Sequence, residues 1–190
     1  MAESRDSEQR REEFIRAAEK LFKTNGIMDT TVNAIVREVD VAKGLFYYYF
    51  KSKDDVIEAI ARQYSKAFEK TIGRSLNRDD YDERLHQFTE NVIVSFRELW
   101  GNLRGENENI DLSILSNRTL DETKAIAADV LKKLLDEGIA AGKLQITNSR
   151  YYADIIIGGI ADLIRQNQAD PDEIKKIIND MIDMMRKESK

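Results

Sequence analysis

The chain has 190 residues, of which 42% are hydrophobic, enough for one large domain or two small ones with a core of their own. It contains no cysteine, which excludes disulfides, thiolate metal sites and a cysteine nucleophile and favours a reducing cytoplasm. A net charge of -5 argues at first against nucleic acid as a partner, because phosphate binding requires positive potential. The charge is uneven, however: Lys and Arg number 10 against 9 Asp and Glu up to Lys53, and 20 against 26 beyond it. The charge of the N-terminal part therefore permits DNA binding but does not demonstrate it.

The residue pattern predicts an all-α protein. Only one proline is present, glycines are scattered, and no stretch alternates between apolar and polar residues as a half-buried strand does. The N-terminus is polar and lacks the apolar segment of a secretory signal. The longest apolar run, residues 155–161, is too short to cross a bilayer. We expect a soluble, cytoplasmic protein with no membrane partner.

Apolar periodicity and capping residues divide the chain into nine expected helices. Thr31 is a plausible N-cap for the second of them, and Gly26 stands where a glycine commonly ends the first. Thr119 and Glu122 form a possible capping box, which predicts a break between the sixth and seventh helices. The expected helices are 9–25, 32–39, 42–50, 52–73, 81–100, 110–116, 119–142, 151–168 and 171–185.

Residues 30–53 carry two short helical patterns joined by a tight turn. In the second of these helices, spacing sends Phe46, Tyr49 and Phe50 inward and leaves the remaining positions of residues 43–48 on other faces. A short helix, a turn and a second helix with a cation and phenols at its exposed surface are the parts of a helix-turn-helix that reads DNA.

The last two expected helices hold more apolar residues than a terminal hairpin needs. Gly158 and Gly159 lie in the middle of the first, where each costs about 1 kcal/mol of helix propensity relative to alanine. Close approach of a second copy of the chain would offset that cost, and an ordinary buried helix in a monomer is the alternative. The residues expected at a homodimer interface are Ile156, Gly159, Ile160, Leu163, Ile178, Ile182 and Met185.

The N-terminal motifs resemble a known family. Thr30-Thr31-Val32, Ile35-Val36, Val41, Lys43-Gly44, the run from Phe46 to Phe50 and Lys53 are similar to the DNA-binding signature of TetR-family transcriptional repressors. The likeness covers roughly residues 10–57. It implies a nine-helix homodimer, with a DNA-binding domain at 1–51 and an effector-binding and dimerisation domain at 52–190, connected by the fourth helix. It also implies that an inducer shifts this helix and spreads the two DNA-binding domains.

Carried over by position, the resemblance implies a set of DNA contacts at the start of the second helix, along the third and at the start of the fourth. These residues are Thr31, Asn33, Lys43, Gly44, Leu45, Tyr47, Tyr48, Tyr49 and Lys53. The chain departs from the family pattern in the turn, where it has Val39-Asp40 in place of Ala-Gly, and at the start of the third helix, where it has Ala42 in place of Ser or Thr. Asp40 stands in the turn where the family usually has glycine, and Leu45 offers base edges only an apolar contact.

Aromatic residues of the second part are candidates for an apolar effector pocket, although a plain core would show the same stripes. The candidates are Tyr64, Phe68, His86, Phe88, Phe96 and Trp100. His86 is the only histidine, which disfavours a catalytic triad or a multi-histidine metal site. We expect no enzyme activity, no cofactor and no metal.

Taken with these residues, the resemblance implies a ligand-responsive regulator, expected to be a repressor, that binds a double-stranded DNA operator as a homodimer and is released by a small apolar or aromatic effector. The alternative is an all-helical small-molecule or protein-binding module whose helix-turn-helix no longer binds DNA.

Overall fold

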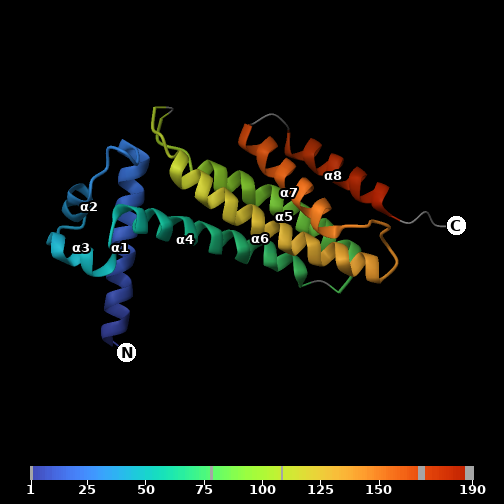
Figure 1. The fold of residues 1–190 in the computed structure, drawn as a ribbon, viewed down its shortest axis with the longest axis horizontal. Helices are drawn as coiled ribbons and strands as arrows, with labels where there is room; N and C mark the ends of the chain where they lie inside the picture. Colours follow the sequence, from blue (N-terminus) through green and yellow to red (C-terminus); the bar gives the residue numbers. More distant parts are fainter. Residues whose placement is uncertain (1, 78, 108, 167–169, 187–190) are drawn as a thin grey trace. The chain divides into compact units, whose positions relative to one another are not determined.

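The computed structural model describes residues 2–77, 79–107, 109–166 and 170–186. Within these ranges the chain is helical and holds no named strand, with one isolated β-bridge between Leu144 and Arg186. Figure 1 labels eight α-helices: α1 (Ala2–Asn25), α2 (Val32–Glu38), α3 (Lys43–Tyr49), α4 (Lys53–Gly73), α5 (Tyr81–Asn102), α6 (Ser113–Ala140), α7 (Ser149–Gln166) and α8 (Pro171–Met185). A 3-10 turn, Arg74–Leu76, follows α4. The all-α prediction is confirmed.

The expected count of nine helices is not confirmed, because the sixth and seventh expected helices form the single helix α6 in the described part of the chain. Thr119 does not cap a new helix. Its side chain is buried and its hydroxyl donates to the Leu115 carbonyl at 2.8 Å, one turn back. Glu122 accepts a hydrogen bond from the Ser65 hydroxyl at 2.7 Å instead of returning to the backbone. A threonine that bonds within the preceding turn lets a helix continue, which the sequence pattern alone did not reveal.

The described residues form two compact units, and α4 and α6 contribute residues to both. The N-terminal unit contains the residues up to Tyr64 together with Asn102–Thr119. The C-terminal unit contains Ser65–Gly101 and the residues from Leu120 onward. None of the helices in the described ranges combines the length and apolar character needed to cross a bilayer.

Aromatic side chains fill the core of the N-terminal unit. Phe14 of α1 is fully buried, and its ring meets Phe46 of α3 edge-on with centroids 5.6 Å apart. Phe50, at the end of α3, lies against both rings, with centroid distances of 6.4 Å to Phe14 and 5.7 Å to Phe46. The predicted inward positions Phe46 and Phe50 are thus confirmed, and they fix α3 to α1.

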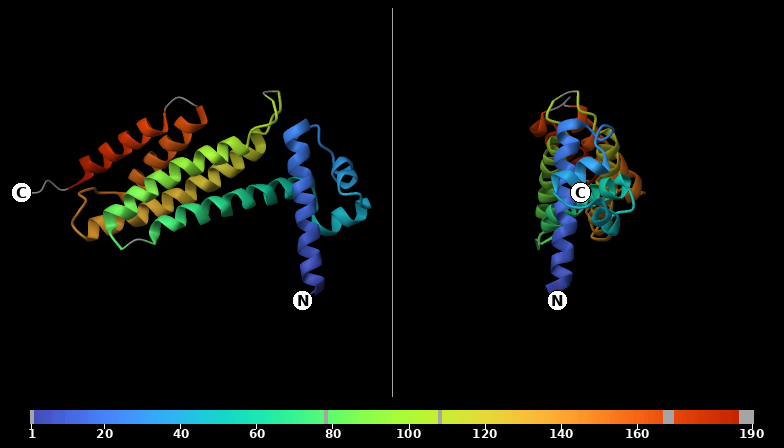
Figure 2. Two further views of the ribbon diagram at one scale, coloured as in Figure 1. Left: turned by 180° about the vertical axis from the view of Figure 1, so that it is seen from behind. Right: turned by 90° about the vertical axis from the view of Figure 1, so that its left-hand side faces the viewer.

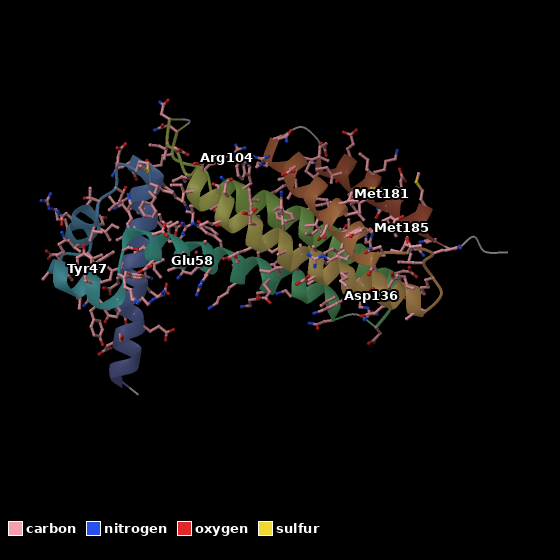
Figure 3. The ribbon with its side chains drawn as sticks, in the orientation of Figure 1. Tyr47, Glu58, Arg104, Asp136, Met181 and Met185 are labelled. Carbon is pink, nitrogen blue, oxygen red and sulfur yellow. The ribbon has the colours of Figure 1, made fainter. Side chains whose placement is uncertain are left out.

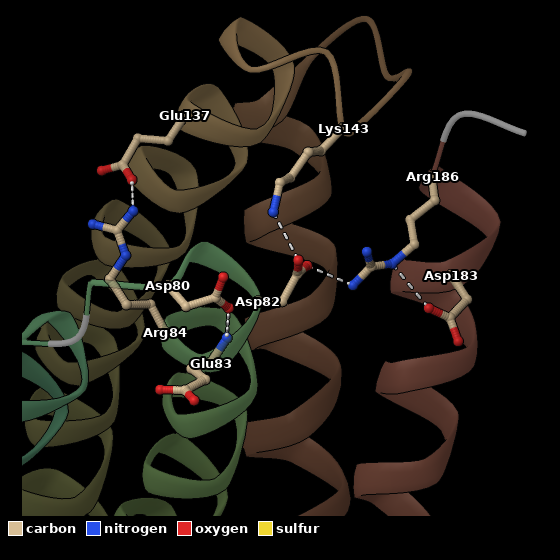
Figure 4. A network of polar contacts seen from close by, with 8 residues as sticks. All are labelled: Asp80, Asp82, Glu83, Arg84, Glu137, Lys143, Asp183 and Arg186. Atoms are coloured by element: carbon tan, nitrogen blue, oxygen red, sulfur yellow. Dashed lines mark hydrogen bonds and ion pairs between the residues drawn. The ribbon is translucent and has the colours of Figure 1, made fainter. Parts of the chain in front are cut away.

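The helices α5, α7 and α8 of the C-terminal unit each bury an apolar stripe, and the left-hand view of Figure 2 shows α7 alongside α8. At one end, Asp82 of α5 lies between two cations (Figure 4). It accepts hydrogen bonds from Lys143 at 2.7 Å and from Arg186 at 2.8 Å. Nearby, the backbone N–H of Gln145 donates to the Met185 carbonyl at 2.8 Å. These contacts join the start of α5, the segment after α6 and the end of α8.

The pKa of Asp82 is lowered from its usual value of 3.8, chiefly by the hydrogen bond from Lys143 and also by Arg186. The ionised carboxylate therefore stabilises the folded unit above pH 3.8, and this contribution is lost as the pH falls through the lowered value. We expect Asp82→Asn to unfold at lower denaturant concentration at neutral pH and to show a smaller loss of stability on acidification than the wild type. Urea titrations followed by circular dichroism between pH 7 and 2 test this. Asn in place of the exposed Asp180 of α8 is the control, and an equal pH response in the two variants would contradict the assignment.

Candidate nucleic-acid interface

The start of α2 is capped as its sequence predicts. Thr31 has an extended backbone, and its hydroxyl accepts a hydrogen bond from the Ala34 N–H at 3.2 Å. Both Thr31 and Asn33 are exposed, so the first turn of α2 presents polar side chains and unpaired backbone N–H groups to solvent. A helix start of this kind is suited to hold an anion. Ile35 and Val36 are buried on the opposite face and hold the helix in place.

The turn between α2 and α3 has a geometry that usually calls for glycine. Asp40 has a φ of 56°, and within the described ranges it is the one non-glycine residue with a positive φ. Its N–H donates to the Arg37 carbonyl, and the next N–H, of Val41, donates to the Val36 carbonyl at 3.1 Å. These two bonds are those of a Schellman motif, in which a left-handed residue closes the helix. Asp40 thus adopts the left-handed conformation at the position where the family usually has glycine.

The third helix is seven residues long and exposes most of its surface. Lys43, Gly44, Tyr47 and Tyr48 are exposed, with Tyr47 half and Tyr48 three-quarters accessible. Figure 3 shows Tyr47 directed away from the body of α3. The Lys43 ammonium lies 5.9 Å from the centre of the Tyr47 ring, a distance at which cation and aromatic ring attract each other.

Two other residues of α3 have divided environments. Tyr49 is half-buried, with its ring 6.0 Å from that of Phe14 and 4.9 Å from that of Tyr48. Leu45 is half-buried and, with Tyr48 and Tyr49, lines an open groove against the first turns of α1. A methyl group added at Gly44 would meet no atom within 4 Å, so the free protein itself does not require glycine there.

Lys53 has a different environment from Lys43. It is the first residue of α4, and its ammonium donates hydrogen bonds to the carbonyls of Ile27 and Thr30 in the turn between α1 and α2. The start of α4 is itself fixed by a capping box, in which Ser52 and Asp55 each accept from the other's backbone N–H at 3.2 Å. Of the nine predicted contact residues, eight thus lie on α2, its N-cap or α3, and Lys53 anchors the adjoining turn.

Several polar contacts between α1 and α4 were missed by the sequence analysis. The Tyr64 hydroxyl donates to the Glu19 carboxylate, and it accepts from the Lys23 ammonium at 3.1 Å. Burial, together with the Glu19 hydrogen bond, raises the pKa of Tyr64 to about 12, so the phenol keeps its proton. These partners are more than 40 residues apart in sequence, and no local pattern could have paired them.

The predicted effector-pocket residues do not all lie together. Phe68, Phe88 and Phe96 are buried in the C-terminal unit, with the Phe68 and Phe96 rings 4.8 Å apart. Trp100 is half-buried in the same unit. Tyr64 belongs to the N-terminal unit, where its hydroxyl is bound by α1.

Two residues change the list of candidate pocket residues: His86 leaves it because it is exposed, and Ser95 joins it because it is buried. His86 is exposed, with its Nε2 3.5 Å from Glu90, because it falls on the solvent side of α5 and not on its apolar stripe. Ser95 is buried on α5, and its hydroxyl makes no hydrogen bond to any residue in the described ranges. The sequence signal for this group is a serine at an otherwise apolar position of the helix.

The predicted dimer residues are divided between the inside and the outside of the C-terminal unit. Five of them are buried within the single chain: Ile156, Ile160, Ile178, Ile182 and Met185. Gly159 is exposed and Leu163 is half-buried. The apolar side chains that α7 and α8 expose are instead Tyr151, Tyr152, Ile155, Ile177 and Met184.

In the ranges that the structure describes, no group of three or more His, Cys, Asp or Glu could hold a metal ion. The helices α2 and α3 offer hydroxyls, the exposed ammonium of Lys43 and a helix start, which are groups of the kinds that bind phosphate or base edges in DNA-binding proteins.

Comparison with known sequences finds relatives of one kind. Residues 14–60 match the sequence model described as bacterial regulatory proteins, tetR family. The chain is 30% identical over 122 residues to the HTH-type transcriptional regulator HbdR of Aromatoleum sp. (strain CIB), a match that covers 64% of this chain and 48% of HbdR. It is 33% identical over 88 residues to the uncharacterized HTH-type transcriptional regulator YuxN of Bacillus subtilis (strain 168), covering 42% of this chain and 29% of YuxN. The chain thus spans less than half the length of these curated relatives.

Solved structures share the fold over nearly the whole chain. A bacterial regulatory protein in the tetR family from Rhodococcus RHA1 matches with a TM-score of 0.64 at 17% identity, covering 95% of this chain and 98% of that one. The fatty acid degradation regulator FadR from Bacillus halodurans matches with a TM-score of 0.63 at 20% identity, covering 90% and 93%. At such low identity, these likenesses establish the fold alone.

The left-handed turn residue gives a prediction about stability. A side chain in this region costs roughly 1–2 kcal/mol relative to glycine, less for Asp or Asn, while glycine loses more backbone entropy on folding. We expect Asp40→Gly to raise the free energy of unfolding by about 0.5–1 kcal/mol and Asp40→Asn to leave it nearly unchanged. Chemical denaturation of the three proteins measures both effects. A gain in the Asn variant equal to that in the Gly variant would trace the effect to charge and not to backbone strain.

Proposed function

Because this chain belongs to the TetR family of bacterial regulatory proteins, we propose that it is a cytoplasmic, ligand-responsive transcriptional repressor. It binds a pseudo-palindromic operator as a homodimer and is released by a small apolar or aromatic effector. The proposal rests on the exposed surface of α3. Lys43, Tyr47 and Tyr48 are accessible to solvent there, while Phe46 is buried on the other side of the helix and fixes it.

Each group on this surface has a role in DNA recognition. In a helix-turn-helix the second helix enters the major groove with its N-terminal residues against the base edges. Lys43 is the first residue of α3 and supplies the charge that reads guanine O6 and N7. Gly44 lets the backbone approach the DNA, and Leu45 contacts a thymine methyl group. Tyr47, Tyr48 and Tyr49, with Thr31 and Asn33, donate hydrogen bonds to phosphates.

The homodimer is supported by a second apolar stripe on each of the last two helices. On α7, Tyr152, Ile155 and Gly159 follow one another at helical spacing and are exposed. On α8, Ile177 and Met184 are exposed and Met181 between them is half-buried, whereas Met185 is buried within the chain (Figure 3). A single chain leaves both stripes in water, so a second copy is the occupant that would pair them symmetrically. A methyl group added at Gly158 or Gly159 would meet nothing within 4 Å, which fits glycines kept for a neighbouring helix.

The effector is assigned to the aromatic residues of the C-terminal unit. Phe68, Phe88 and Phe96 offer apolar surface, Trp100 lies in the same unit, and the unpaired hydroxyl of Ser95 offers one hydrogen bond. A buried hydroxyl without a partner is unfavourable, so a ligand that bonds to it gains affinity. A mainly apolar molecule with one polar group suits these residues.

A second candidate function rests on Asp40 and on the net charge of the chain. A carboxylate in the turn next to α3 weakens the attraction for phosphate, as would suit a binding module that no longer reads DNA. The decisive difference is whether the protein retains any DNA at low salt.

Selection of fragments from a random or genomic DNA pool, followed by titration of the selected site at several salt concentrations, tests the proposal. We expect a pseudo-palindromic site and a steep salt dependence. Lys43→Ala should lower the slope of log affinity against log salt by about 1 and relax the preference for the selected base pairs. Retention of no fragment by the wild type at low salt would favour the second candidate.

The dimer is tested separately by a charge placed on the exposed stripe. Ile155 is 68% exposed in the single chain, so Ile155→Glu should leave the fold intact and convert a dimer into a monomer by burying a charge at its interface. Analytical ultracentrifugation at micromolar concentration measures the mass, with circular dichroism to verify folding. Glu in place of the exposed Ala140, at the end of α6, is the matched control. A wild-type monomer, or an Ile155→Glu dimer, would contradict the proposed interface.

A further inference from the structure

We propose that Lys53 is a positioning residue, which acts on DNA binding by holding the turn between α1 and α2 and not by neutralising a phosphate. The proposal deepens the function given above and rests on it. It concerns a lysine that the family resemblance assigns to phosphate.

The ammonium of Lys53 is already engaged within the chain. It donates to the Ile27 carbonyl at 2.6 Å and to the Thr30 carbonyl at 2.9 Å. Both distances are those of strong, charge-assisted hydrogen bonds. An ammonium has three N–H groups, so two are used by carbonyls that lie 26 and 23 residues earlier in the sequence.

The rest of this turn is held by the chain as well. Thr30 is buried, with 1% of its surface exposed, and its hydroxyl donates to the Gly26 carbonyl at 2.8 Å. Gly26 has a φ of 85° and closes α1 with a 2.9 Å bond from its N–H to the Phe22 carbonyl. Side chains thus bind the carbonyls of Gly26, Ile27 and Thr30, and Lys53 supplies two of these three contacts.

The position of the turn sets the position of the DNA-contacting surface. Thr30 is followed directly by Thr31, the N-cap of α2, so a shift of the turn moves the first turn of α2. The other end of the contact is fixed, because the Ser52 and Asp55 capping box holds the start of α4 from which Lys53 projects. Lys53 therefore ties α2 to α4, and α3 follows α2 through the Schellman turn at Asp40.

Lys43 provides the contrast. It is exposed, its ammonium lies over the Tyr47 ring, and it stands at the start of the helix proposed to enter the groove. Removing its charge should reduce the number of counterions released on binding. Removing the charge of Lys53 should instead displace the turn between α1 and α2. This should weaken all phosphate contacts together but leave their number, and therefore the salt dependence of binding, unchanged.

The first test compares Lys53→Met with Lys43→Met, two variants with neutral side chains of similar length. Affinity for the selected operator is measured over a range of salt concentrations. We expect Lys53→Met to bind about tenfold more weakly, as the loss of charge-assisted hydrogen bonds implies, with the salt slope of the wild type. Lys43→Met should lose about 1 from the slope. A slope lowered by about 1 in Lys53→Met as well would overturn the proposal.

The second test uses Thr30→Val, which removes the bond to Gly26 at a buried position and changes no charge. If Lys53 acts through the turn, the double variant should lose less affinity than the sum of the two single losses, because both act on one structure. Losses that add fully would overturn the proposal.

A third measurement is independent of DNA. In the free protein, the carbonyl ¹³C signals of Ile27 and Thr30 should shift in Lys53→Met, because these carbonyls lose a hydrogen-bond donor. The carbonyl signals of α3 should show no shift from a lost hydrogen bond in Lys43→Met, because the Lys43 ammonium lies over the Tyr47 ring. Unchanged Ile27 and Thr30 signals would overturn the proposal. If the wild type bound no DNA, the proposed function would fail while these signals still reported on the Lys53 contacts. Should Lys53→Met not fold, Lys53→Gln is carried through the same measurements.

Discussion

The packing of Phe46 against Phe14 is the interaction on which the candidate interface depends. An isolated helix shorter than about 12 residues is marginal in water, and α3 has seven. It persists because one fully buried ring meets Phe14 edge-on at 5.6 Å and Phe50 closes the helix on the same cluster. The exposed side chains of α3, those of Lys43, Tyr47 and Tyr48, are therefore not needed to fill the core. They can be selected for what they contact outside the protein.

Polar contacts extend this anchoring to α4. Glu19 and Lys23 join α1 to Tyr64, the twelfth residue of α4. Arg118 of α6 donates a hydrogen bond at 2.8 Å to Asp54 in the first turn of α4. Exposed pairs contribute little individually, but the half-buried Tyr64 cluster excludes water from its bonds. The part of α4 up to Tyr64 therefore belongs to the same compact unit as α1, α2 and α3. Within that unit, a force applied to α4 would be transmitted to α1 through these contacts and to α2 through Lys53.

The features that could be predicted from the sequence are those with local causes. The cap at Thr31 acts over three residues, and the structure has it where the sequence pattern placed it. The inward direction of Phe46 and Phe50 likewise followed from helical spacing. The continuous α6 did not, because Thr119 fits both a cap and a helix interior, and only its burial against the fold decides between them. The partners of Lys53 and Tyr64 depend on segments far away in the sequence, which periodicity cannot bring together.

The helix α8 carries two apolar stripes, and the sequence does not tell which of them is buried. Ile174, Ile178, Ile182 and Met185 form one stripe, and Ile177, Met181 and Met184 form another, one position away. Periodicity detects both but cannot say which faces the core; the fold buries the first and leaves the second to solvent. In the proposed homodimer the second stripe gains a function, since it holds two DNA-binding units in one molecule. Binding of the second half-site then becomes intramolecular, which multiplies a modest affinity at each half-site. A single unit with one unshielded lysine at the start of α3 and an acid in its turn can therefore serve as half of an effective DNA-binding protein.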